Sequence, residues 1–249
     1  MVLALNLFAI VYLFSLVWWA GAAGLLLSIL YLEMIYPRLN FFGAATQSVR
    51  NRGSNAVAIT FDDGPSVWTT PILETLKTEG VKATFFLLGK NVERHPDIAR
   101  RIKAEGHTVG LHGHSHTKLH LKGPQFIRRD FDQCETAFLK AGLSHSQIVR
   151  FPHGLKNIFA VAEIRRRHYH LCAWGKGVWD SKLPGVDWII ARSLEIQPGE
   201  ILLLHDGDGV KENPDRSQTA EALPKILQGL KARGYEFVTL AKVESNESA

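Results

Sequence analysis

The sequence predicts an α/β fold in which helices cover a parallel sheet, preceded by an N-terminal transmembrane helix. Two observations lead to this prediction. From residue 56 onward, short apolar runs alternate with longer amphipathic runs, which is typical of repeated strand–helix units. Before that point, Glu33 is the first charged residue of the chain. An uncharged, mostly apolar stretch of this length is long enough to cross a bilayer core of about 30 Å as a helix.

Residues 1–36 are therefore predicted to be a membrane anchor, and residues 37–55 a polar connector. The alternative is a cleavable signal peptide, because Ala20, Gly21 and Ala22 resemble a cleavage site. However, no Lys or Arg precedes the apolar run, and the run resumes at Leu25, which favours a retained anchor. One long tilted helix and a tight pair of segments around Gly21 both fit this pattern.

One domain is predicted over residues 56–242, followed by a flexible tail over 243–249. Apolar runs predict strands at 56–61, 83–88, 108–111, 148–151, 170–174, 201–204 and 236–240. Amphipathic runs predict helices at 70–79, 98–105, 125–141, 188–195 and 219–233. Gly80 and Gly106 end the first two of these helices. Seven or so units in about 190 residues favour a closed or nearly closed barrel, with an open doubly wound sheet as the alternative.

The composition argues against a nucleic-acid partner. The formal net charge of +5 and the isoelectric point near 9.2 are only mildly basic, and no run of Lys and Arg alternates with aromatic residues. Cys134 and Cys172 are neither closely paired nor spaced as metal ligands, so they are interpreted as ordinary thiols.

Two adjacent carboxylates, Asp62 and Asp63, directly follow the first predicted strand, within the run Thr-Phe-Asp-Asp-Gly-Pro. Neighbouring residues of an extended chain point in different directions, so one carboxylate can bind a metal while the other acts as a base beside it. The same letters alone also fit a solvated Asp-Gly turn.

A histidine pair follows the third predicted strand. His112 and His116 are four residues apart, which would place both imidazoles on one face of a helical turn, ready to bind one cation. His114 falls off that face and is expected to take no part. Two His and one Asp form a facial triad that leaves coordination positions open for water and substrate.

Three further clusters follow predicted strands. Arg150 is at a strand end, where its guanidinium could hold a carboxylate through two hydrogen bonds. Trp174 is followed six residues later by Asp180, and His205 follows a buried apolar run. Each of these residues, taken singly, is most often a structural loop residue.

Together and in this order, the five clusters resemble the polysaccharide deacetylase family with the NodB homology domain (carbohydrate esterase family four). The resemblance extends from about residue 56 to 240, and the blocks at 60–65, 112–116 and 202–207 are individually distinctive. It implies a distorted (β/α)7 barrel of the NodB-homology type. It also implies hydrolysis of the N-acetyl amide of an amino sugar in a polysaccharide or glycan, with a divalent metal, commonly zinc.

The resemblance assigns the first five residues to the metal and the base. Asp63, His112 and His116 would bind the divalent metal. Asp62 would be the general base that takes a proton from water, and Arg150 would orient Asp62 and keep it ionised.

The other five residues would act on the acyl group and the leaving amine. The backbone N–H of His153 would help to stabilise the oxyanion. His205 would be the general acid that protonates the amine, with Asp180 tuning it. Trp174 and Leu203 would line the pocket for the acetyl methyl group.

Two blocks depart from the family pattern. In the third block, Phe151 and His153 replace the usual first Pro and the aromatic residue, which changes the wall of the sugar site. In the fourth block, Trp179 precedes Asp180 and Ser181 follows it, where the family usually has a Trp after its Asp. The second departure bears on the assignment of Asp180.

The expected partners are an N-acylated glycan or a lipid-linked amino sugar, together with the membrane. An anchor would hold the site near the bilayer, which makes a deacetylase or deformylase of a lipid-linked sugar the main alternative. A non-catalytic, membrane-tethered carbohydrate-binding protein is a further one. Family substrates usually lie outside the cytoplasm, so the expected location is the inner (plasma) membrane with an extracytoplasmic catalytic domain. Arg38, Arg50 and Arg52 favour the opposite orientation by the positive-inside rule.

Overall fold

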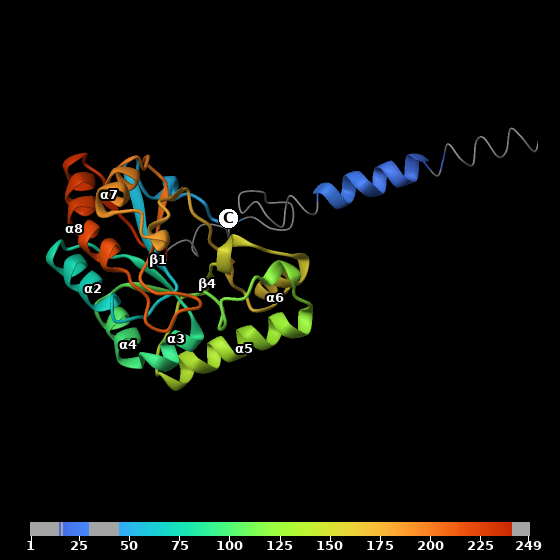
Figure 1. The fold of residues 1–249 in the computed structure, drawn as a ribbon, viewed down its shortest axis with the longest axis horizontal. Coiled ribbons are helices and arrows are strands. Elements are labelled where there is room, and N and C mark those ends of the chain that lie inside the picture. Colours follow the sequence, from blue (N-terminus) through green and yellow to red (C-terminus); the bar gives the residue numbers. More distant parts are fainter. Residues whose placement is uncertain (1–14, 16, 30–44, 241–249) are drawn as a thin grey trace, which may run out of the picture.

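The computed structural model describes residues 15, 17–29 and 45–240, which Figure 1 draws as coloured ribbons. Residues 17–29 are helical. In this described part of the chain, no helix is both long and apolar enough to cross a membrane. The rest of the predicted anchor over 1–36, the start of the connector and the tail over 243–249 lie outside the described residues.

The central sheet is built from parallel strands. Within the described residues it contains β1 (Ala56–Asp62), β2 (Thr84–Leu87), β3 (Thr108–Leu111), β4 (Ile148–Val149), β5 (His170–Leu171), β6 (Lys176–Gly177), β7 (Ile201–His205) and β8 (Glu236–Phe237). The strands follow the order β5-β4-β3-β2-β1-β7-β6, and β8 pairs with the start of β1. The prediction of a parallel α/β fold is therefore confirmed.

The sheet is a half-barrel, so the prediction of a closed or nearly closed barrel is only partly right. Among the described residues, β5 and β6 end the strand order and no ladder joins them. Strand β4 stops short of the predicted end because Pro152, which has no N–H to donate, begins the short η3 turn (Pro152–Gly154). Beyond β5, Cys172 pairs with Thr46 of the connector by an isolated bridge.

Helices surround the sheet, as Figure 1 shows. In the described domain they are α2 (Thr69–Thr78), α3 (Gly89–Arg94), α4 (Pro96–Ala104), α5 (Pro124–Lys140), α6 (Ile158–Arg166), α7 (Val186–Leu194) and α8 (Ser217–Ala232). Neither α3 nor α6 is among the predicted amphipathic runs, although Arg165, Arg166 and Arg167 were interpreted as lying at a helix end. The first is only six residues long, and the second begins with the exposed Ile158 and Phe159, which obscure an amphipathic pattern.

The core lies between the sheet and its helices. All seven residues of β1 are buried because the strand is covered on both faces. The rings of Phe61 on β1 and Phe85 on β2 stack with centroids 5.0 Å apart. Ile72 and Leu76 of α2 are fully buried. Burying side chains of this size stabilises the fold by about 1.5–3 kcal/mol each.

The strand register brings the predicted chemical residues to one edge of the sheet. Asp62 at the end of β1 pairs with His205 at the end of β7. Leu111 at the end of β3 pairs with Val149 of β4, so His112 and Arg150 follow side by side. Because all the strands are parallel, their carboxyl ends meet at this one edge, where open α/β sheets bind ligands.

Candidate active site

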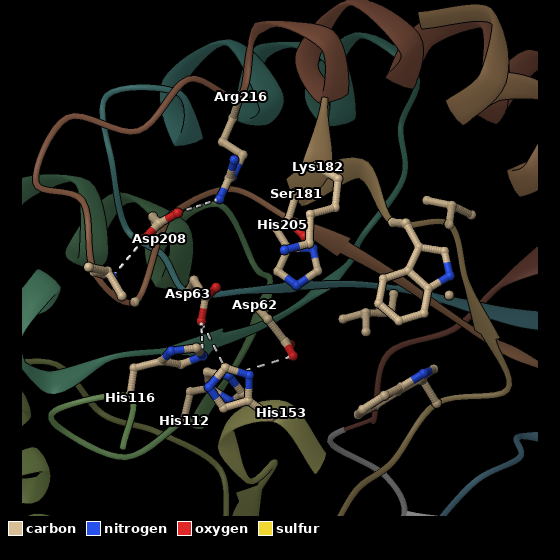
Figure 2. Close-up of a pocket in the computed structure, with 17 residues that line it drawn as sticks. Asp62, Asp63, His112, His116, His153, Ser181, Lys182, His205, Asp208 and Arg216 are labelled. Carbon is tan, nitrogen blue, oxygen red and sulfur yellow. Dashed lines mark hydrogen bonds and ion pairs between the residues drawn. The ribbon is translucent and has the colours of Figure 1, made fainter. Parts of the chain in front are cut away.

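A cavity of about 520 Å³ opens at the carboxyl ends of the strands. Eight of the ten residues predicted for the site line it: Asp62, Asp63, His112, His116, His153, Trp174, Leu203 and His205. Figure 2 shows the labelled side chains of this cavity. Arg150 and Asp180 lie behind its wall, fully buried.

Three of these side chains form one cluster, the Asp–His–His group of Asp63, His112 and His116. Their ligand atoms all lie within 4.8 Å of one another. Oδ1 of Asp63 lies 3.3 Å from Nε2 of His112 and 3.0 Å from Nε2 of His116. The same oxygen is buried and has no hydrogen-bond donor in the described chain. A carboxylate oxygen and two imidazole nitrogens that converge in this way fit a divalent cation.

The two imidazoles of the Asp–His–His group favour the ionised form of Asp63. Burial favours the neutral carboxyl of Asp63 and so acts to raise its pKa. The close imidazoles of His112 and His116, when protonated, outweigh burial and hold that pKa well below its usual range. A dication can replace the protons that the imidazoles would otherwise supply.

The histidines do not lie on a helical turn, so that prediction was wrong. Residues 112–116 form an irregular bend in which Gly113 has φ 78° and His116 has φ 61°. Asp63 likewise has φ 71°. Left-handed conformations are costly for residues other than glycine and persist where the surroundings enforce them, often at functional sites. The bend brings the two imidazoles together in place of helical spacing.

A buried carboxylate on α5 holds this bend. Asp130 accepts hydrogen bonds from the backbone N–H of His114 at 2.9 Å and of Ser115 at 3.1 Å. It also accepts one from the hydroxyl of Ser115 at 2.6 Å. Nδ1–H of His112 donates to the carbonyl of Arg150 at 2.8 Å, which leaves Nε2 free to act as a ligand. The sequence analysis missed Asp130, because no local pattern links it to the histidines.

Asp62 is bound by the buried Arg150. Nη1 of Arg150 donates to Oδ1 of Asp62 and to the hydroxyl of Thr60, both at 2.8 Å. Nη2 donates instead to the carbonyl of Ala173 at 2.8 Å. The prediction that Arg150 holds a carboxylate through two hydrogen bonds is therefore only partly right, because Arg150 donates one hydrogen bond to Asp62. The rest of the guanidinium is fixed by other partners, including the ring of Phe86, whose centroid lies 4.2 Å from Cζ.

His205 is paired with Asp180, despite the altered fourth block. Nδ1–H of His205 donates to Oδ1 of Asp180 at 2.8 Å. Oδ2 of Asp180 accepts from the backbone N–H of His205 at 2.7 Å and from the hydroxyl of Thr219 at 2.9 Å. Burial lowers the pKa of His205, but the charge and hydrogen bond of Asp180 outweigh it and raise that pKa to about 9. This histidine is therefore protonated at neutral pH.

The remaining predicted residues line the cavity. His153 has φ 59° in the η3 turn, and its ring centroid lies 4.5 Å from that of His116. Burial and the neighbouring His116 lower the pKa of His153 to about 4, so its imidazole is neutral at pH 7. Trp174 and Leu203 supply apolar surface to the same cavity.

A second buried carboxylate, Asp206, supports the loop that carries Asp63. Its Oδ2 accepts from the hydroxyl of Thr69 at 2.5 Å, and its backbone carbonyl accepts from the hydroxyl of Ser66 at 2.5 Å. Gly64 is required here, because a Cβ at this position would overlap the Asp206 carboxylate. Burial raises the pKa of Asp206 to about 7. The only sequence signal for Asp206 was its place directly after His205.

Comparison with known proteins identifies the family. Residues 49–171 match the family model of polysaccharide deacetylases. The chain is 34% identical over 205 residues to a peptidoglycan-N-acetylglucosamine deacetylase of Bacillus cereus, with 81% of this chain and 93% of the relative covered. It is 32% identical over 200 residues to a chitooligosaccharide deacetylase of Bradyrhizobium sp., covering 77% of this chain and 91% of the relative.

A solved structure agrees with these matches. It is a peptidoglycan N-acetylglucosamine deacetylase in complex with 4-naphthalen-1-yl-N-oxidanyl-benzamide, with a TM-score of 0.72 and 32% sequence identity. The alignment covers 79% of this chain and 90% of that one. The half-barrel fold agrees with the sequence matches. This chain therefore belongs to the polysaccharide deacetylase family, carbohydrate esterase family four.

Proposed function

We propose that this protein is a divalent-metal-dependent hydrolase that removes the acetyl group from an N-acetylated amino sugar of a glycan, releasing acetate and a free amine. One observation carries the proposal. A single cavity is lined by the Asp–His–His group, by a second carboxylate (Asp62) beside it, and by His205, which is paired with the buried Asp180 behind the cavity wall. These are the groups that amide hydrolysis needs: a base for water, support for an oxyanion, and an acid for a poor leaving group.

We assign the cation to Asp63, His112 and His116. The unpartnered, buried Oδ1 of Asp63 and the two facing Nε2 atoms support this assignment, and zinc suits a set of nitrogen and carboxylate ligands. When bound, a divalent cation supplies Lewis-acid chemistry, polarising the acyl carbonyl and making a water molecule a better nucleophile.

Asp62 is the proposed general base. Its carboxylate lies beside the Asp–His–His group, with Oδ2 3.8 Å from Nε2 of His112. Its other oxygen is held by Arg150, so the carboxylate is fixed in orientation before substrate arrives. Asp62 would take the proton of the attacking water.

His205 is the proposed general acid. Asp180 fixes its Nδ1–H, so Nε2 is the atom available to give a proton to the leaving amine. The raised pKa of His205, about 9, keeps this proton in place at neutral pH. Trp174 and Leu203 would contact the acetyl methyl group, and the backbone N–H of His153 would stabilise the oxyanion.

The names of the relatives suggest the substrate class. One acts on the N-acetylglucosamine of peptidoglycan and another on chitooligosaccharides. We propose a polymeric or oligomeric N-acetylglucosamine glycan for this chain as well. The apolar stretch over 1–36 would place the domain at the inner membrane, and a glycan substrate would place it on the extracytoplasmic side. This stretch also supports a lipid-linked amino sugar as the second candidate substrate.

A direct assay tests the proposal. The purified chain is incubated with an N-acetylglucosamine tetramer, a peptidoglycan glycan strand and an undecaprenyl-linked N-acetyl amino sugar. Released acetate is quantified, and the products are examined by mass spectrometry for a loss of 42 Da per acetyl group removed. Acetate release that a chelator stops and Zn²⁺ restores supports the proposal. Binding of these glycans without any acetate release would instead favour the non-catalytic interpretation.

A further inference from the structure

The proposed mechanism orients the substrate in the cavity. Hydrolysis breaks the bond between the carbonyl carbon and the nitrogen, and His205 gives its proton to that nitrogen, which stays on the sugar. The sugar therefore lies on the His205 side, and the acetyl group lies toward Trp174 and Leu203. Ser181 and Lys182 line the cavity and directly follow Asp180, which is hydrogen-bonded to His205; Figure 2 labels Ser181, Lys182 and His205. Ser181 and Lys182 thus face the sugar.

Lys182 is a cation without a partner at this edge. Of the two Lys or Arg side chains that line the cavity, Arg216 is nearly buried and bonded to the carboxylate of Asp208 at 2.9 Å and to the carbonyl of Gly207 at 2.8 Å. Lys182 is exposed, and its ammonium makes no hydrogen bond or ion pair with the described residues. An uncompensated cation at the rim of a binding cavity attracts an anionic group.

The turn that carries Lys182 is anchored to His205 through Asp180. Trp179 and Leu183, which flank the short η4 turn (Asp180–Lys182), both adopt left-handed backbone conformations, with φ 60° and 55°. Asp180 within the turn is fully buried and bonded to His205 and Thr219. The backbone that carries Lys182 is therefore anchored next to the catalytic acid.

The same turn presents an aromatic surface. Trp179 lines the cavity, yet 68% of its surface remains exposed. A large exposed indole beside a cavity can pack against the apolar C–H face of a sugar ring while its N–H remains free for a hydrogen bond. Such packing does not depend on the charge of the sugar.

We propose that Trp179 and Lys182 form a specificity rim that selects an anionic glycan. Lys182 would bind a carboxylate or phosphate next to the N-acetylated sugar, and Trp179 would pack against a sugar ring. This inference rests on the proposed function, because it uses the role of His205. The anionic group has two sources: an acidic sugar within the glycan chain, or a phosphate at the end that would be linked to a lipid.

The test measures kcat/KM for four matched substrates. These are a neutral N-acetylglucosamine tetramer, a peptidoglycan tetrasaccharide with lactyl carboxylates, the same tetrasaccharide with those carboxylates amidated, and an N-acetylglucosamine oligomer that ends in a 1-phosphate. The variants are Lys182→Gln and its control Lys211→Gln, which alters an exposed lysine that does not line the cavity. The wild type should prefer one or both anionic substrates, and added salt should weaken that preference.

Lys182→Gln should lower kcat/KM for the preferred anionic substrate by about tenfold, while the neutral and amidated substrates change less than about twofold. Lys211→Gln should change none of them. Trp179→Ala should lower kcat/KM for all four substrates alike, while Trp188→Ala, at an exposed position away from the cavity, should not. The source of the anion is identified by which substrate the wild type prefers, the one with lactyl carboxylates or the one with a 1-phosphate.

The rim proposal would be overturned if Lys182→Gln lowered kcat/KM equally for neutral and anionic substrates. It would also be overturned if the wild type showed no preference for anionic substrates. Calorimetric binding of the same oligosaccharides separates this failure from failure of the proposed function. If no acetate is released, a loss of affinity in Lys182→Gln confined to anionic ligands still supports the rim. In that case only the hydrolytic role is rejected.

Discussion

The site has a metal half (Asp63, His112 and His116) and an acid half (His205 and Asp180), and their buried carboxylates differ in hydrogen bonding. In the metal half, the buried Oδ1 of Asp63 faces two imidazoles and finds no hydrogen-bond donor among the described residues. In the acid half, Asp180 accepts three hydrogen bonds, two from His205 and one from Thr219. Buried polar atoms are normally satisfied, so the first half is incomplete as a protein structure alone and the second is not.

Because of this difference, we expect the two halves of the site to respond differently to metal removal. The metal half should depend on a cation for both activity and order, because its ligands come from irregular loops with left-handed residues. The acid half stands on the end of β7 and on a buried carboxylate, so its geometry should survive metal removal.

Replacing a ligand should abolish both metal binding and activity. We expect His116→Ala to release the bound metal and to reduce acetate release to background, because one of three protein ligands is lost. Elemental analysis of the purified variant measures its metal content, and its circular dichroism spectrum shows whether it is folded. His168→Asn, at an exposed histidine away from the cavity, is the control. A variant that retains stoichiometric metal would refute the ligand assignment.

Asp62→Asn should separate catalysis from metal binding. Loss of a general base is expected to lower kcat by about 10²–10⁴-fold. Metal content should stay at the wild-type level, because Asp63 rather than Asp62 belongs to the Asp–His–His group. Single-turnover assays and elemental analysis on the same sample measure both quantities. Wild-type turnover in this variant would mean that another group is the base.

The carboxylate beneath the metal half should tune metal affinity. Asp130→Asn leaves one carbonyl oxygen to hold the bend that carries His114 and Ser115, and we expect metal affinity to fall by about 10–100-fold. Competition with a chromophoric chelator measures this change. Asp132→Asn is the matched control on the same helix, because its exposed carboxylate pairs with Arg167 outside the site. Equal affinity in the wild type and Asp130→Asn would show that the bend needs no such support.

Asp180→Asn should change the pH profile and leave metal content intact. A general acid works only while protonated, so the rate falls as the pH rises through the pKa of His205. That pKa is raised to about 9, and part of the increase comes from Asp63, whose charge a cation offsets. In the metal-loaded wild type, the rate should therefore fall on the basic side of the pH profile at a pH between about 6.5 and 9. In Asp180→Asn this fall should occur at a lower pH. An unmoved basic limb would exclude Asp180 as the group that tunes it.

The sequence predicted the chemical residues better than the frame that holds them. Asp62, His112, Arg150 and His205 each follow an apolar run directly, and parallel strands bring such positions together at one edge. The order of five short blocks was therefore enough to gather ten residues from distant parts of the chain. Family resemblance, rather than spacing, supplied the role of each residue.

Features that depend on long-range contacts were not predicted. The bend of 112–116 is set by Asp130, which lies on another element, so local spacing suggested a helical turn instead. Beyond β5 of the half-barrel, Cys172 pairs with Thr46 of the connector, a contact that no periodicity reveals. Asp206 drew no attention because its importance comes from contacts with Thr69 and Ser66 across the fold.

The central claim is that a cation in the metal half makes this chain a glycan deacetylase. The most direct measurement is a titration of chelator-treated, metal-free protein with Zn²⁺ while acetate release from an N-acetylglucosamine tetramer is recorded. We expect no release without metal and a linear rise that saturates at one metal ion per chain. Full activity in the metal-free protein, or saturation of metal binding without any acetate release, would contradict the claim.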